Sequence, residues 1–302
     1  MNRFNQILIA ALLVQAIIAG GIFFGNQPPA AEQLRTALLS ADKNEVDRIT
    51  IDEGDGKQTV LTKADGIWLL PDYHQLPADN SKVDGILARL EATSSGWPVA
   101  TTASGRDRFK VADDSFQKKV TLSKGDDDLQ TLYLGTSPGF RQLHIRRSGE
   151  DQVYAVKLNS YDFPSQHSSW LDKTLLQPEA DIVSLKGPDF AFNRLGDDWQ
   201  LIEGEGEAVN DEVDKLIRTL TRLSVHGVED VSVDDSEYEL SISAAGDSYI
   251  YRFYKEGSNH YISRDDFNEV FRINQSDYEN ITGLSATQLV KQADDEEKER
   301  DS

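Results

Sequence analysis

The polar and apolar positions of this chain repeat after an interval of 130 residues. Asn80 to Leu90 aligns without a gap with Asn210 to Leu220, and the apolar positions 83, 86, 87 and 90 correspond to 213, 216, 217 and 220. This is the spacing of one apolar stripe along a helix. We therefore predict two amphipathic helices, one in each half of a tandem repeat.

Each predicted helix begins with two polar residues three positions apart, Ser81 with Asp84 and Asp211 with Asp214. The pairs resemble capping boxes in which Asp replaces Glu, and such boxes satisfy the N–H groups that the first helical turn leaves unpaired. The alternative is that these carboxylates are catalytic. We interpret them as caps because the spacing fits that role.

A strand, a turn and a second strand precede each helix. Thr59 to Ala64 leads through Asp65-Gly66 into Ile67 to Leu70, and Asp-Gly between apolar runs is a strong hairpin signal. In the second half, Phe190 to Leu195 leads into Trp199 to Ile202.

Trp68 and Trp199 hold equivalent places directly after the two turns. Large aromatic side chains mostly fill cores, so we predict that each covers the apolar stripe of the following helix. The alternative is that the two are ligand-stacking aromatics.

Strands dominate the rest of each half. The predicted strands are 119–123, 129–134, 142–146 and 152–156 in the first half, and 237–243, 248–254, 260–263 and 269–273 in the second. A hairpin, one helix and a meander of about four strands make an α+β unit, in which one main helix covers a face of an antiparallel sheet.

These segments define the predicted domains. They are, in order, a transmembrane anchor (1–25), a linker (26–43), a first α+β repeat (44–165), a connector (166–180), a second α+β repeat (181–290) and a disordered acidic tail (291–302). The tail holds three basic and six acidic side chains and no large apolar one, which is typical of a disordered segment.

The anchor is predicted at Ile7 to Phe24, a stretch without charge and with one polar side chain, Gln15. About 20 apolar residues cross a bilayer. Arg3 is the only basic residue among the first 31, so the N-terminus is expected in the cytoplasm and the body in the periplasm, at a bacterial inner membrane. The competing interpretation is a cleaved secretory signal, but bulky Ile22 to Phe24 stand where small residues would mark the cleavage site.

Composition narrows the classes of partner. The chain has 52 acidic and 31 basic residues and a net charge of -21, so it repels phosphate backbones and nucleic acid is not an expected partner. It has no cysteine, which excludes disulfides, thiolate metal sites and cysteine nucleophiles.

Basic residues gather in the first half of the chain. They are Arg106, Arg108, Lys110, Lys118, Lys119, Arg141, Arg146 and Arg147. We interpret them as a solvated sheet edge, where Lys and Arg are common. The alternative is a surface for anionic lipid or for an acidic partner.

No pattern assembles a catalytic, cofactor or metal site. Gly135 to Gly139 matches Gly-x-Ser-x-Gly around Ser137, but Pro138 lacks the N–H that an oxyanion hole needs after the serine. The five histidines show no metal-binding spacing. We predict no catalytic residue, no metal and no cofactor.

A series of motifs runs through the body in chain order: Gly66-Ile67-Trp68, Val153 to Val156, Phe163, Trp170 to Leu176 and Asp181 to Leu185. With these motifs, over about Asn44 to Leu284, the chain resembles the membrane-anchored domain-of-unknown-function family "forty-three-forty". Its members are often encoded beside ABC-type exporter permeases and proteins like gliding-motility auxiliary components. The resemblance implies an envelope protein that works with an ABC transporter, and it supplies no catalytic residues.

The expected function is that of a non-enzymatic, periplasmic-facing accessory or scaffolding protein of an ABC-type export or gliding-like envelope complex. Its expected partners are the membrane, through residues 7–24, and the permease or ATPase subunits of the transporter. The alternative is a membrane-anchored envelope glycan-binding protein or hydrolase, whose site would form only in three dimensions around His74, His144 or His167.

Overall fold

The computed structural model describes Gln15 and residues 36–231, 236–244 and 246–292. The expected anchor at 7–24, apart from Gln15, lies outside the described residues, as do the linker up to residue 35 and the expected tail from residue 293. Within the described part, no helix has both the length and the apolar character that crossing a membrane requires.

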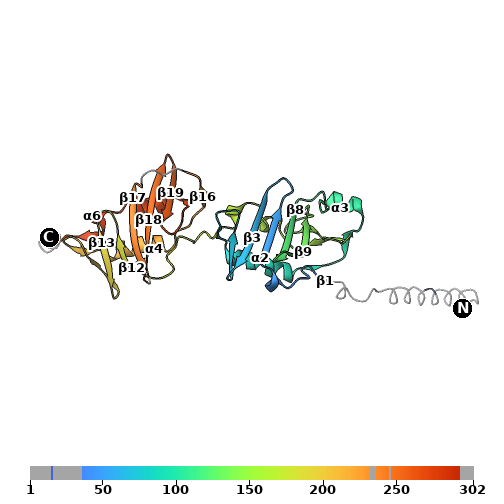
Figure 1. The fold of residues 1–302 in the computed structure, drawn as a ribbon, viewed down its shortest axis with the longest axis horizontal. Coiled ribbons are helices and arrows are strands. Elements are labelled where there is room, and N and C mark those ends of the chain that lie inside the picture. Colours follow the sequence, from blue (N-terminus) through green and yellow to red (C-terminus); the bar gives the residue numbers. More distant parts are fainter. Residues whose placement is uncertain (1–14, 16–35, 232–235, 245, 293–302) are drawn as a thin grey trace, which may run out of the picture. The chain divides into compact units, whose positions relative to one another are not determined.

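Antiparallel strands with a few helices make up the described chain, which confirms the α+β class at that level (Figure 1). The residues divide into two compact units. The first unit lies within Met1–Lys57 and Gly85–Phe163, and the second within Gln58–Asp84 and Pro164–Ser302.

The larger sheet has nine strands in the order β5-β4-β3-β2-β8-β9-β10-β11-β7. Their bounds are β2 Arg48–Asp52, β3 Gln58–Ala64, β4 Ile67–Leu70, β5 Leu76–Pro77, β7 Pro98–Ala100, β8 Lys118–Lys124, β9 Asp127–Leu134, β10 Leu143–Arg147 and β11 Val153–Val156.

The second sheet has eight strands in the order β14-β13-β12-β17-β18-β19-β20-β16. Their bounds are β12 Ile182–Lys186, β13 Ala191–Leu195, β14 Asp198–Leu201, β16 Gly227–Glu229, β17 Tyr238–Ala244, β18 Asp247–Glu256, β19 Asn259–Arg264 and β20 Val270–Ile273. Apart from the edge strand β5, which has no counterpart in the second sheet, the two orders correspond: a hairpin, one further strand (β2 or β12), a four-strand meander, and the next strand of the sheet after the main helix, β7 or β16.

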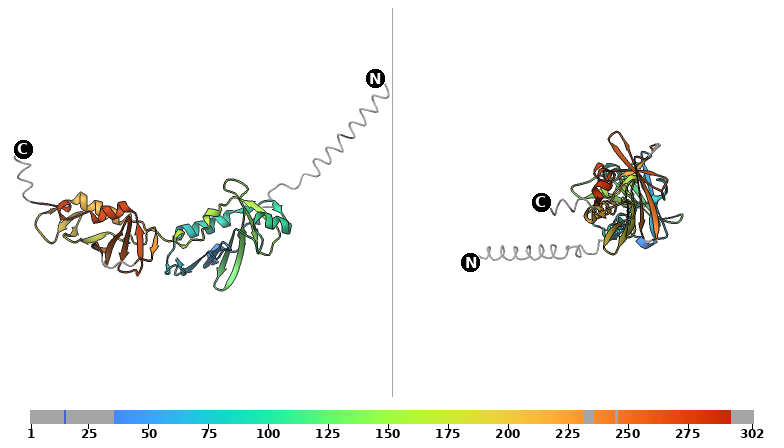
Figure 2. Two further views of the ribbon diagram at one scale, coloured as in Figure 1. Left: turned by 90° about the horizontal axis from the view of Figure 1, so that it is seen from above. Right: turned by 90° about the vertical axis from the view of Figure 1, so that its left-hand side faces the viewer.

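Helices lie along one face of each sheet (Figure 2). They are α2 Asn80–Ala92, α3 Ala103–Phe109, α4 Asn210–Leu220, α5 Gln275–Thr282 and α6 Ala286–Leu289, with short 3-10 turns η2 Lys43–Glu45, η3 Ser160–Asp162 and η4 His167–Ser169. Two small antiparallel pairs complete the fold: β1 Thr36–Ala37 with β6 Ser94–Ser95, and β15 Glu207–Ala208 with β21 Val290–Lys291.

Asp65 and Gly66 form the two-residue turn between β3 and β4, and their backbone conformation explains why the chain reverses there. Both residues have positive φ, 51° at Asp65 and 86° at Gly66. A two-residue turn of this kind matches the twist of the flanking strands, and Asp and Gly tolerate positive φ better than other residues.

The two tryptophans join hairpin to helix by the same two hydrogen bonds. The backbone N–H of Trp68 donates to Asn80 Oδ1 at 2.8 Å, and its indole Nε1 donates to Asp84 at 3.2 Å. The equivalent bonds from Trp199 measure 2.7 Å to Asn210 and 3.1 Å to Asp214. Both indoles are buried.

This arrangement corrects the interpretation of the acidic residues as caps. Asp84 and Asp214 accept the indole N–H groups across the hairpin–helix boundary. Lys82 N instead donates to Asp79, and the residue that precedes α4, Val209, makes no side-chain capping bond. The aspartates fix the tryptophan rings because a buried indole N–H needs an acceptor.

We predict that Asp84→Ala lowers the free energy of unfolding by about 1–2 kcal/mol, because it removes the acceptor of a largely buried indole N–H. Asp84→Asn keeps an oxygen acceptor and should recover most of that loss. Urea denaturation followed by circular dichroism measures the change. Ser81→Ala is the matched control, expected within about 0.5 kcal/mol of the parent. A larger effect of Ser81→Ala than of Asp84→Ala would restore the capping-box interpretation.

Candidate functional site in the first unit

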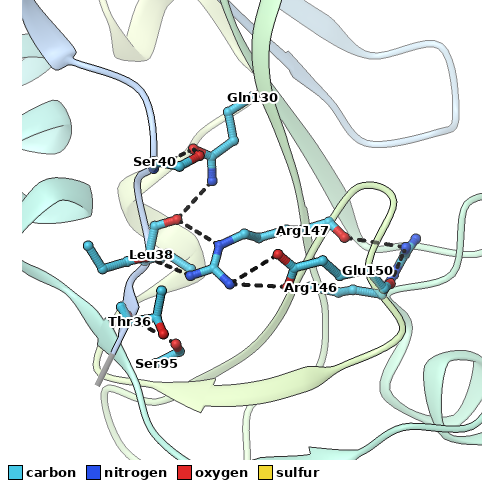
Figure 3. Close-up of polar contacts among 9 residues, drawn as sticks. Thr36, Leu38, Ser40, Ser95, Gln130, Arg146, Arg147 and Glu150 are labelled. Atoms are coloured by element: carbon cyan, nitrogen blue, oxygen red, sulfur yellow. Dashed lines mark hydrogen bonds and ion pairs between the residues drawn. The ribbon is translucent and has the colours of Figure 1, made fainter. Parts of the chain in front are cut away.

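The first unit holds the C-terminal part of the predicted linker (26–43) in a fixed place, so this part of the chain belongs to the folded unit (Figure 3). Thr36 and Ala37 pair with Ser95 and Ser94 as a short antiparallel ladder. The N–H of Leu38 donates to Thr93 O at 2.8 Å, and Ser95 Oγ donates to Thr36 O at 3.0 Å. We call residues 36–40 the clamped segment.

Gln130, on β9, binds the clamped segment from the sheet. Its Nε2 donates to the carbonyl of Leu38 at 2.8 Å, while its Oε1 accepts from the N–H and the hydroxyl of Ser40 at 2.8 and 2.9 Å. One amide side chain therefore satisfies three polar groups of a segment 90 residues away in sequence.

Arg147, at the end of β10, provides the charged part of the clamp. Its Nε donates to Leu38 O at 3.0 Å and its Nη2 to Ala37 O at 2.6 Å, while Nη1 lies 3.1 Å from the carboxylate of Glu150. The side chain is buried, and a buried guanidinium is stable only where its N–H groups meet acceptors. The backbone carbonyls of the clamped segment are those acceptors.

Leu38 and Leu39 add apolar burial to these polar contacts. Leu38 is fully buried and Leu39 nearly so. Burying one leucine side chain contributes about 1.5–3 kcal/mol. The clamped segment is therefore held by packing as well as by hydrogen bonds.

Arg146 points to the opposite face of β10, as the alternation along a strand requires. Its Nε donates to Val111 O at 2.6 Å, its Nη2 lies 2.8 Å from Asp113, and its guanidinium stacks on the Tyr133 ring at 4.4 Å. The hydrogen bond from Arg146 holds the pKa of the Asp113 carboxyl below its ordinary value. Burial raises the pKa of the Tyr133 hydroxyl.

These contacts overturn the interpretation of Arg146 and Arg147 as part of a solvated basic edge. Both side chains are buried and engaged with backbone carbonyls. Arg108, Lys110 and Arg141, from the same predicted cluster, are exposed.

The residues weighed for catalysis have local partners. The Ser137 hydroxyl donates to the carbonyls of Gly139 and Gln142, both at 2.7 Å, inside its own loop. His144 is buried, hydrogen bonds Thr136 Oγ1 at 2.9 Å and lies against Phe109. Burial lowers the pKa of the His144 imidazole.

Two other histidines flank one tyrosine in the second unit. His74 and His167 lie on either side of Tyr73, with ring centroids 5.6 and 5.7 Å away, and His74 Nδ1 is 3.4 Å from Glu269. Among the residues that the structure describes, no group of three or more His, Cys, Asp or Glu is arranged to hold a metal ion.

The family comparison gives the chain its place among known proteins. The model of the family described as "Domain of unknown function (DUF4340)" matches residues 68–241. This match covers more than half of the chain, and the chain belongs to this family. The search of curated proteins and the search of solved structures found no match.

We predict that Arg147→Ala weakens the attachment of the clamped segment by about 1.5–3 kcal/mol, the range for hydrogen bonds made by a charged group. Gln130→Glu keeps the acceptor for Ser40 but loses the donor to Leu38, and should act in the same direction. Hydrogen–deuterium exchange of residues 36–40 measures the effect as faster amide exchange at Leu38.

Arg108→Ala is the control for this experiment, because Arg108 is exposed and has no contact with the clamped segment. Unchanged exchange at Leu38 in both Arg147→Ala and Gln130→Glu would mean that strand pairing and leucine burial alone hold the segment.

Proposed function

We propose that this protein of the DUF4340 family is a non-enzymatic, single-pass membrane protein that serves as an accessory or scaffolding subunit of an ABC-type export or gliding-like envelope complex. Its N-terminus would lie in the cytoplasm and its body in the periplasm. The observation that carries the proposal is the clamped segment, because it fastens to the body the chain that follows the predicted membrane span.

The length of the intervening chain supports a body held close to the membrane. Eleven residues, 25–35, lie between Phe24, the end of the apolar stretch, and Thr36, the first residue of β1, so the chain takes 12 residue steps from one to the other. A fully extended chain of that length spans roughly 40 Å.

We also infer that the two sheets are copies of one α+β module, preceded by a transmembrane helix at 7–24. The strand orders, which correspond except for the additional edge strand β5, and the two equivalent tryptophan–helix contacts support the duplication. A scaffolding role suits such a body, because two similar modules offer two similar surfaces to the subunits of one complex.

The partner class rests on the family. The resemblance described from the sequence implies an ABC-type exporter as partner, and the local partners of Ser137 and His144 support a binding role over a catalytic one.

We predict that a cysteine at Lys255 is labelled by a membrane-impermeant maleimide in intact spheroplasts, whereas a cysteine at Asn5 is labelled only after lysis. The chain has no cysteine of its own, so each variant carries one reactive thiol, and Lys255 is exposed near the end of β18. The parent chain is the unlabelled control. Protection of Lys255→Cys until lysis would place the body in the cytoplasm and contradict the proposal.

We predict that affinity purification from native membranes in mild detergent recovers an ABC permease and its ATPase in near-equal amounts with this protein. Mass spectrometry and densitometry measure the ratio. A control chain in which residues 7–24 are replaced by an unrelated transmembrane segment separates contacts of the body from contacts of the anchor. Recovery of the protein alone, also after crosslinking, would end the transporter assignment and direct tests to glycan binding and hydrolysis.

A further inference from the structure

The first unit carries two adjoining pockets that share Arg89 and Lys157. One has a volume of about 510 Å³ and the other about 540 Å³. Phe140 and Arg141 line the first, and Ser94 to Gly96 line the second. We call the combined depression the basic groove.

The charges of the basic groove are only partly compensated. Arg89 pairs with Asp162. Among the described residues, no carboxylate forms an ion pair with Arg141 or Lys157, and the Arg141 guanidinium instead lies 5.1 Å from the centre of the Phe140 ring. The groove therefore presents two free positive charges on a chain with a net charge of -21.

Three exposed aromatic residues either line the groove or adjoin a lining residue in the sequence. Phe140, in its lining, is 88% exposed; Trp97, directly after Gly96, is 64% exposed; and Tyr161, between the lining residues Asn159 and Asp162, is 86% exposed. Large aromatics exposed to this degree mark a contact surface. Aromatic rings beside Lys and Arg are the side chains that proteins place at the headgroup level of a bilayer.

The clamped segment reaches the unit at the wall of this groove. Thr36 pairs with Ser95, and Ser95 lines the groove. The 12 residue steps from Phe24 to Thr36 allow roughly 40 Å at most between the predicted span and this point. The lipid surface that holds the anchor is therefore within reach of the groove, at a high effective concentration.

We propose that the basic groove docks on the phospholipid headgroups of the membrane that holds the anchor, with lipid phosphates at Arg141 and Lys157 and with Trp97 and Phe140 at the interface. The proposal rests on the proposed function, because it requires the anchor to be in the membrane. Charge complementarity favours the groove, because Arg141 and Lys157 have no carboxylate partner among the described residues while the chain as a whole is acidic. The short chain between the predicted membrane span and Thr36 favours the membrane surface as the partner of the groove, because it keeps that surface within reach.

Trp97 is a built-in probe, because the other three tryptophans, Trp68, Trp170 and Trp199, are at most 3% exposed. The full chain is reconstituted into vesicles of equal parts phosphatidylglycerol and phosphatidylcholine, with and without bromine on the phosphatidylcholine acyl chains. We expect brominated lipid to quench the Trp97 contribution, taken as the difference between the parent and Trp97→Phe. We expect Arg141→Glu combined with Lys157→Glu to abolish that quenching.

Arg108→Glu is the matched control, because it reverses an exposed charge of the same unit outside the groove, and it should leave the quenching unchanged. Vesicle flotation is measured on every sample and tests the anchor separately. A chain that does not float contradicts the proposed function itself. A chain that floats with Trp97 unquenched overturns the docking proposal alone.

A photo-crosslinker at Phe140 in native membranes tests the other occupant. Crosslinks to phospholipid are the expected result. Crosslinks to one protein with no lipid adduct would make the groove a protein interface and overturn the proposal.

Discussion

A buried guanidinium must find hydrogen-bond acceptors, and this requirement ties the beginning of the described chain to the middle of the first unit. Arg147 lies in the interior at the end of β10, and its N–H groups reach the carbonyls of Ala37 and Leu38. Gln130, on β9, donates a further hydrogen bond to the carbonyl of Leu38. Removing these side chains would leave carbonyls and amides without partners in an interior that excludes water, which costs more than the bonds themselves contribute. The clamped segment keeps its position because leaving these buried groups unpaired costs more than the bonds contribute.

The need of a buried N–H group for an acceptor also determines the contacts of Trp68 and Trp199. Each indole N–H is carried into the core by a hairpin and meets an aspartate on the helix that follows, so hairpin and helix are locked in one relative placement. The asparagine at the start of each helix takes the tryptophan backbone N–H in both halves. Apolar packing alone would allow the helix to slide along the sheet, whereas a directional bond at each end of the contact fixes it.

Much of the fold could be read from the periodicity of the sequence, because the helices and meander strands each bury one regular stripe or face. The Asp65-Gly66 hairpin and the eight meander strands are present, with ends shifted by a few residues. The short helices α3, α5 and α6 were not predicted, since four to eight residues carry too little periodicity. The clamp was also missed. Gln130 shares a strand face with Leu132, so alternation places it on the core side, whereas Arg147 lies one residue beyond the predicted strand 142–146 and only the observed β10 puts it on the face of Leu143 and Ile145. Alternation along a strand does not predict which groups Arg147 and Gln130 bind, because those groups lie about 90 to 110 residues earlier in the chain.

The clamp determines how the body responds to its attachment. Moving Thr36 away from the unit would break, together, the pairing with β6, the bonds from Arg147 and Gln130 and the burial of Leu38. Because these contacts come from β6, β9 and β10, a displacement at the N-terminal side is shared by the sheet and is not absorbed by a loose loop. A tether that ended at an unstructured loop would leave the body free to turn at that point. Thr36 stands at the N-terminal end of these contacts and pairs with Ser95 in the wall of the basic groove, so the fold itself fixes where the chain enters the unit relative to the groove.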